Sequence, residues 1–291
     1  MKMDIIKRRQ HYIPKTYLKQ FATVGKSNNM IFAYFIKQKV NRFVSIDDVC
    51  VESYLYEHYI CYNNGETGFV LPNSIENGYM RYENAYGKMV NTIINNCDNI
   101  ISLTAEERSN LTEFMLSMLF RHPMFVNITN EIGEKMYNGQ NDIRDDLTIK
   151  FPGIDDTCFK MMFLHLLLEN AQDPKQCSMI RAMKKVCDED QFCVFKSTKG
   201  EFITSDAPVV NVYGEANGIQ YDLVGMPISP EFFIAFVDTD VNVSNKVFVI
   251  DSEKTTKLNK YQYDRPITSI MLSKNEDTLR RQCEVFIENR D

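Results

Sequence analysis

The residues best suited to chemistry are a histidine near the N-terminus and two charged residues far from it along the chain. His11 is one of only four histidines and stands before Tyr12-Ile13-Pro14, where a fold alone needs no imidazole. Arg121 follows a strongly apolar run, and Asp206 ends a predicted strand. An imidazole transfers protons near neutral pH, a guanidinium stabilises developing negative charge, and a carboxylate orients a histidine or holds a divalent ion. The three groups together are those needed for acid–base cleavage of a phosphate ester.

Arg121 and His122 directly follow the apolar run 111–120, so the core of a helical bundle receives a guanidinium that needs an anionic partner. Glu83 lies beside the apolar stripe of the preceding predicted helix, close to the face that is buried. One interpretation is an ion pair between Glu83 and Arg121 across two neighbouring helices. The other is that one of these side chains faces a cleft and binds a phosphate or carboxylate.

The segment 202–209 runs from a strand into Thr204-Ser205-Asp206 and then a proline. Ser205 and Asp206 either bond their own backbone in a turn, or the turn holds the Asp206 carboxylate at a sheet edge. In the second case the carboxylate is aimed at a ligand, a metal or His11.

The other histidines receive a structural interpretation. His165 lies among leucines and is predicted to be a core histidine, and His58 lies in an aromatic segment expected at the surface. No histidine pair has zinc-hydrolase spacing, and the chain has no G-x-S-x-G elbow, P-loop or G-x-G-x-x-G motif. The common local motifs are therefore excluded, whereas a site built from distant residues is not.

The elements that must position these groups predict an α+β fold. Apolar residues at helical spacing predict a bundle over about 75–187, with a capping box at Thr104 and a restart at Pro123. From Gln191 onward, short runs of β-branched and aromatic residues separated by turn residues predict a mostly antiparallel sheet. The last 40 residues are predicted to return to helix. The sheet is thus built mainly from the C-terminal half, with the helices packed against it.

Length and composition predict one compact domain spanning 1–291. We divide it into a basic N-terminal segment with a hairpin (1–65), a helical subdomain (66–188) and a sheet-rich subdomain (189–291). Hydrophobic residues make up 44%, charged residues 25%, and the net charge is −6, which argues against polyanion binding by the whole surface. The N-terminal segment is the clearest local basic excess, and Lys7, Arg8 and Arg9 are its candidate phosphate-binding residues.

Eight cysteines are scattered without a C-x-x-C pair, and no signal peptide precedes them. We expect free thiols and a cytoplasmic location. No apolar run reaches the ~20 residues of a membrane span, so we expect no membrane association.

Several segments resemble, in order along the chain, those of the bacterial domain of unknown function family 4238. The opening 10–21 is similar to H-Y-[VI]-P-x-x-[YF]-L-[KR]-x-F, and 49–56 is similar to V-x-x-E-x-x-[FL]-Y. Arg121-His122-Pro123 resembles R-[TH]-P, a motif whose second residue is His in some members and Thr in others. The segment 202–209 resembles F-[IL]-T-S-D-x-P-[VF], and 226–230 resembles P-[LI]-S-P. The resemblance covers most of the chain. The residues that match the family's pattern are His11, Glu52, Glu83, Arg121 and Asp206.

Two functions follow from these residues and the resemblance. The first is a nuclease-like effector or toxin of bacterial defence or mobile-element origin. In it His11, Glu52, Arg121 and Asp206 are catalytic, Mg²⁺ or Mn²⁺ is a possible cofactor, and nucleic acid or a nucleotide is the partner. Its binding residues are Tyr12, Glu83, His122, Ser205, Lys7, Arg8 and Arg9. The second is a non-catalytic sensor or protein-binding module whose partner is a phage or host protein.

Overall fold

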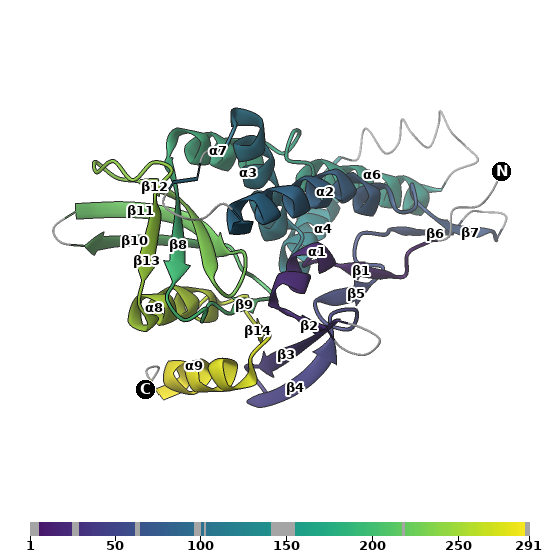
Figure 1. The fold of residues 1–291 in the computed structure, drawn as a ribbon. Helices are drawn as coiled ribbons and strands as arrows, with labels where there is room; N and C mark the ends of the chain where they lie inside the picture. Colours follow the sequence, from purple (N-terminus) through teal and green to yellow (C-terminus); the bar gives the residue numbers. More distant parts are fainter. Residues whose placement is uncertain are drawn as a thin grey trace.

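The computed structural model describes residues 6–24, 29–61, 65–95, 100–101, 103–140, 155–216 and 219–288 (Figure 1). Its helices are α1 Lys15–Leu18, η1 Lys19–Phe21, α2 Ser74–Asn95, α3 Ala105–Phe120, α4 Pro123–Asn138, α6 Asp156–Gln172, α7 Ser178–Glu189, α8 Ser252–Tyr263 and α9 Glu276–Glu288. Its strands are β1 Arg9–His11, β2 Thr23–Val24, β3 Asn29–Phe35, β4 Val40–Ser45, β5 Val51–Ser53, β6 Tyr59–Cys61, β7 Thr67–Phe69, β8 Gln191–Ser197, β9 Thr204–Ser205, β10 Val210–Ala216, β11 Ile219–Pro227, β12 Phe232–Asp238, β13 Val247–Ile250 and β14 Ile270–Ser273. The α+β class predicted from the sequence is confirmed.

The larger C-terminal sheet has the strand order β10-β11-β12-β8-β13 and is antiparallel except where β13 runs parallel to β8. Its centre is β12, an almost unbroken apolar run whose residues are buried on both faces of the sheet. Phe232, Ile234 and Phe236 join the main core with the helices. Phe233, Ala235 and Val237 belong to a second cluster that includes partly buried residues of α8. A strand buried on both sides explains why this stretch is apolar throughout instead of alternating.

A second sheet combines the two ends of the chain, which the sequence did not indicate. Its order is β2-β3-β14-β9, with β4 paired to β3. The β3–β4 hairpin was predicted, but β14 lies within the last 40 residues, which were predicted to return to helix. Its residues pair with β3 on one side, Ile270 opposite Phe35, and with β9 on the other. Strand β14 was missed because a four-residue strand gives too short a pattern to recognise in the sequence. The β-structure is therefore not confined to the C-terminal half of the chain.

The helical block begins and ends close to its predicted limits. The capping box is present, with the Glu107 amide donating to Thr104 Oγ1 at 3.2 Å and the Thr104 amide donating to Glu107 Oε2 at 2.8 Å. Pro123 is the first residue of α4, as the sequence predicted. His122 caps this helix, because its Nδ1 accepts from the Met124 amide at 3.2 Å. The Asn63-Asn64 turn, Cys97, Lys2 and Asp4 lie outside the described residues.

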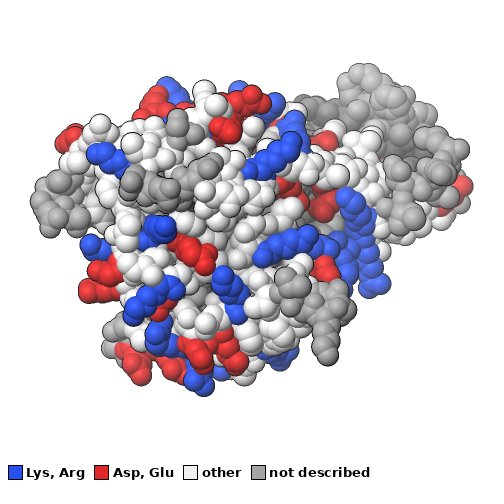
Figure 2. Space-filling view, viewed as in Figure 1, with Lys and Arg blue, Asp and Glu red and all other residues white. Residues whose placement is uncertain are grey.

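Figure 2 shows the same face as Figure 1 with its charges: acidic and basic side chains are interspersed, and basic ones gather over the region of β1. Buried thiols occur at Cys50, Cys158, Cys187, Cys193 and Cys283, none of them in a disulfide. Among the helices of the described ranges, none combines the length and the apolar character needed to cross a bilayer.

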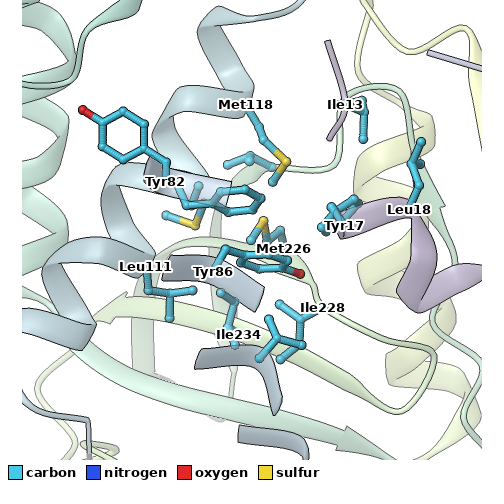
Figure 3. Close-up of a cluster of buried hydrophobic side chains, with 14 of the residues drawn as sticks. Ile13, Tyr17, Leu18, Tyr82, Tyr86, Leu111, Met118, Met226, Ile228 and Ile234 are labelled. Atoms are coloured by element: carbon cyan, nitrogen blue, oxygen red, sulfur yellow. The ribbon is translucent and has the colours of Figure 1, made fainter. Parts of the chain in front are cut away.

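One hydrophobic cluster draws on all three segments of the chain (Figure 3). Tyr17 of α1 packs against Tyr86 of α2 with ring centroids 6.0 Å apart, and Tyr86 stacks on Phe114 of α3 at 3.8 Å. Met226 and Ile228 of the C-terminal sheet region belong to the same cluster. The N-terminal segment is thus held between the helices and the sheet.

Candidate functional site

The N-terminal motif forms β1, which pairs antiparallel with β5 and places Gln10 opposite Glu52. The His11 ring is only 7% exposed, and its Nε2 lies 3.0 Å from the carbonyl oxygen of Ile46. Burial lowers the pKa of His11, so the imidazole is neutral at pH 7. The ring is therefore engaged with the backbone and turned away from open solvent.

Arg121 is buried, with 1% of its surface exposed, and is bonded on both of its terminal nitrogens. Nη1 donates to Glu83 Oε1 at 2.8 Å, and Nη2 donates to the carbonyl oxygen of His11 at 2.8 Å. The guanidinium carbon lies 3.9 Å from the centroid of the Tyr79 ring. The ion pair between Glu83 and Arg121, which the sequence left as one of two interpretations, is present. It joins α2, the end of α3 and β1.

The Asp206 carboxylate, 1% exposed, is held by the residue that precedes β14. The Ser269 amide donates to it at 3.0 Å, and the Ser269 hydroxyl donates as well. Burial raises the pKa of Asp206, and the Ser269 hydrogen bonds act in the opposite direction. Ser205 Oγ accepts from the Ala207 amide at 3.1 Å, which makes the turn that the sequence suggested. Tyr17 Oη lies 2.6 Å from Thr204 Oγ1, so this turn also anchors the N-terminal segment.

Tyr12 and His122 are edge-to-face neighbours, with ring centroids 5.5 Å apart. Tyr12 is buried, and its amide donates to the Cys50 carbonyl at 3.1 Å. Burial lowers the pKa of His122 to about 4, and nearby Arg265 acts in the same direction. A histidine that is neutral at pH 7 and caps a helix through Nδ1 serves the fold.

Glu52 and the basic residues lie apart from this buried set. Glu52 is exposed and lines a shallow pocket of about 460 Å³ together with Arg8 and Arg9. Arg9 donates to Asp48 at 2.7 Å, and the Lys7 amide donates to Asn73 Oδ1 at 2.8 Å. Arg9 is the first residue of β1, and Lys7 and Arg8 directly precede it in the chain.

The four residues predicted to be catalytic do not line a common pocket. Among five pockets of the described residues, Glu52 lines one, and His11, Arg121 and Asp206 line none of the five. Within the same described ranges, no group of three or more His, Cys, Asp or Glu side chains could hold a metal ion. What the motif residues do in this structure is join β1, α2, α3 and β14.

A large apolar pocket lies elsewhere, between the C-terminal sheet and α8. Its volume is about 510 Å³, within the range of small-molecule sites. The sheet contributes alternate residues of several strands, among them Phe195, Val212 and Leu223, which face α8 and not the helical bundle. Burial raises the pKa of the Cys193 thiol, also in the lining, to about 12, so this thiol is protonated and not a nucleophile at pH 7.

The helix α8 contributes two charged residues to this pocket. Lys254, Lys257, Leu258 and Tyr261 all line it, and their spacing puts them on one face of the helix. Sequence reasoning missed this face because two lysines beside a leucine and a tyrosine look like an ordinary solvated helix. The usable signal was that the lysines recur on the same face as the apolar residues, where an amphipathic helix has its core contacts.

Comparison with known proteins adds a family but no reaction. The model of the family described as "Protein of unknown function (DUF4238)" matches residues 9–276. No curated protein and no solved structure matches the chain. The matched span includes both the β1 motif and the pocket under α8.

Proposed function

The chain belongs to the DUF4238 family of proteins of unknown function, and on that premise we propose that it is a binding module, a sensor, for a long-chain aliphatic carboxylate. The ligand occupies the pocket between the C-terminal sheet and α8. The observation that carries this proposal is an apolar cavity of about 510 Å³ whose lining includes two exposed lysines and, among the described residues, no acid.

The apolar lining supports an aliphatic body for the ligand. Most lining side chains, such as Phe195, Leu223 and Phe248, are apolar and offer a ligand no hydrogen bond. Apart from the lysines, the polar side chains in the lining are Thr239, Tyr221 and Tyr261 together with the protonated Cys193 thiol. A nucleotide would leave its sugar and phosphate oxygens largely unpaired there, which costs free energy. An alkyl chain gains from leaving water, at roughly 25 cal/mol for each Å² buried.

The two lysines support a negative headgroup. Within the part of the chain that the structure describes, neither Lys254 nor Lys257 forms an ion pair. Lys260, on the same helix but outside the pocket lining, is paired with Asp264. Two unpaired ammonium groups at the edge of an apolar cavity suit a ligand with one anionic end.

The contacts of the motif residues support a binding role, because His11, Arg121 and Asp206 are all engaged with other protein groups. Arg121 is closed between Glu83 and the His11 carbonyl, and Asp206 is bonded to Ser269. Phosphodiester cleavage by these residues, and a role in bacterial defence, stay predictions that an activity assay can test. The geometry favours the binding role because the large pocket lies away from these residues.

The experiment measures binding by calorimetry below the critical micelle concentration. The full chain is titrated with dodecanoate and, separately, with dodecyltrimethylammonium, which has the same chain and the opposite charge. We expect dodecanoate to bind at least about tenfold more tightly, which corresponds to ~1.4 kcal/mol. Comparable affinity for the two amphiphiles, or no binding of dodecanoate, would refute the proposal.

Variants locate the site. The double variant Lys254→Gln/Lys257→Gln should lose about tenfold in affinity for dodecanoate, because each lysine contributes a charge-assisted contact. Lys260→Gln is the matched control and should bind like the wild type. Val243→Trp, at a partly buried lining residue, should fill the cavity and abolish binding. If Lys260→Gln weakens binding as much as the double variant, the ligand is bound elsewhere.

A further inference from the structure

A chain of hydrogen bonds links a serine to two buried histidines, far from the pocket under α8. Ser74 Oγ lies 2.9 Å from Nε2 of His165. Nδ1 of His165 lies 3.4 Å from Nδ1 of His58, and Nε2 of His58 lies 3.1 Å from Asn130 Oδ1. His165 is fully buried and His58 is 8% exposed, so the expectation of a surface location for His58 was wrong. The buried location predicted for His165 is confirmed.

Asn130, at the end of this series of hydrogen bonds, fixes the position of every proton in the series. Asn130 Oδ1 can only accept, so Nε2 of His58 carries its proton and Nδ1 of His58 is bare. Nδ1 of His165 must then donate to it, which leaves Nε2 of His165 bare. That nitrogen accepts the hydroxyl proton of Ser74. A serine thus faces the basic nitrogen of a histidine whose other nitrogen is oriented by a second side chain, which is the geometry of an activated nucleophile.

Three helices and one loop hold this arrangement. Ser74 begins α2, Asn130 lies on α4 and His165 on α6. The His58 carbonyl accepts from the Val70 amide at 3.0 Å, which ties its loop to the turn before Ser74. At Gly133 the helices α4 and α6 approach so closely that a Cβ would lie 2.6 Å from a Leu164 methyl group. The side chains are therefore positioned by packing, not by sequence neighbours.

Ser74 also reaches solvent. It is partly exposed and lines a pocket of about 160 Å³ together with Arg81, Tyr82, Gln172 and Asp173. The fully buried His165 lies behind it. The amides of Ser74 and Asn77 already donate to carbonyls before the helix, to Leu71 at 3.0 Å and to Asn73 at 2.9 Å. Ser74 nevertheless lies at the positive end of the α2 dipole, which favours an oxygen that becomes negative next to it.

We propose that Ser74 is a nucleophile for acyl transfer, with His165 as its general base and His58 and Asn130 as positioning residues. Ser74 Oγ bonds to the carbonyl carbon of an ester while its proton passes to Nε2 of His165. The carbon–oxygen bond to the leaving alcohol breaks, and that alcohol takes the proton. Water then attacks the acyl-serine through the same base and releases the acid, so an ester and water give an acid and an alcohol.

The pocket defines the class of substrate. Its volume of about 160 Å³ admits only a small acyl group. The side chains beside Ser74 are mostly polar, and Arg81 and Asp173 form an ion pair at 2.9 Å. A short, hydrogen-bonding acyl ester fits this lining, whereas the long aliphatic carboxylate of the other pocket does not. The two sites are therefore distinct in chemistry as well as in place.

The test uses methanesulfonyl fluoride, a small reagent that sulfonylates activated serines, on the full-length protein, with the adduct mapped by mass spectrometry. We expect one adduct, on Ser74, and none on Ser252. Ser252 is an internal control, because it is also partly exposed and is also the first residue of a helix. Ser74→Ala should abolish labelling. An unlabelled wild type, or labelling that survives in Ser74→Ala, would overturn the proposal.

The base is tested separately. His165→Asn should slow labelling at least about a hundredfold, the smaller end of the contribution of a general base. If that variant does not fold, the wild-type pH profile replaces it: the rate should fall as pH decreases through a single midpoint below 6.5, since burial lowers the pKa of His165 to about 4. Asn130→Asp, which keeps the acceptor for His58, should label faster than Asn130→Leu. A pH-independent rate would contradict the role of His165 as the base. Equal rates for the two Asn130 variants would contradict the roles of His58 and Asn130 as positioning residues.

Discussion

Replacing Arg121 by methionine should destabilise the protein by about 3 kcal/mol, because the guanidinium makes three contacts that methionine cannot replace. The variant leaves the His11 carbonyl without its donor, which costs ~1–3 kcal/mol in the interior. It removes the contact with the Tyr79 ring, worth ~0.5–2 kcal/mol. Breaking a buried ion pair from one side costs ~3–5 kcal/mol in total. The lower end applies because Glu83, 24% exposed, can regain water.

The assay is urea unfolding followed by circular dichroism, with Arg81→Met as the matched control. Arg81 also pairs with a carboxylate, Asp173 at 2.9 Å, and lies over a tyrosine ring at 4.5 Å. It is 50% exposed, so its loss should cost less than about 1 kcal/mol. If Arg121→Met costs no more than Arg81→Met, the buried pair is not what joins α2 to β1. The double variant Arg121→Met/Glu83→Leu should cost less than the sum of its single changes.

Two further outcomes follow from the same structure. Burial lowers the pKa of His165 and of His122 to about 4, so between about pH 6.5 and 4 the unfolded chain binds more protons than the folded protein. The free energy of unfolding should therefore decrease as pH falls through this window, by up to ~1.4 kcal/mol per pH unit for each histidine. Urea unfolding at several pH values measures the decrease, which should be less steep in His165→Asn. Stability that stays constant from pH 6.5 to 4 would contradict the burial of both rings. Gly225→Ala should destabilise the protein by several kcal/mol, because the added Cβ would lie 2.4 Å from the Ile234 carbonyl oxygen. Gly87→Ala in α2 should stabilise it by about 1 kcal/mol, because the added Cβ meets no other atom. Thermal unfolding compares the two variants, and equal effects would refute the close approach of β11 and β12.

Much of the fold could be predicted from local patterns, because those patterns act over a few residues. The capping box at Thr104 and the restart at Pro123 depend on hydrogen bonds and sterics within one helical turn. The strands after Gln191 were visible because short runs of β-branched and aromatic residues alternate there with turn residues. The pairing of β14 with β3 was not visible, since it depends on a contact between residues more than two hundred positions apart.

The candidate sites divide in the same way. The motif residues His11, Arg121 and Asp206 were found from the sequence, and the Glu83 partner of Arg121 with them. Their contacts with Ile46, with the His11 carbonyl and with Ser269 were not, because each joins elements distant in sequence. The hydrogen-bond partners of the histidine motif could therefore be assigned only from the tertiary structure.

The sequence by itself determined the class of fold, the helical block and the identity of the polar residues that a core does not need, since burial and helix capping leave local marks. Only the tertiary structure decided which of those residues reach a cavity. It closed Arg121 against Glu83, placed Lys254 and Lys257 beside an apolar pocket, and brought Ser74, His165 and His58 together from three elements. The physical reason is that reactivity and binding depend on distance in space and on access to water, and neither is encoded in the spacing of residues along the chain.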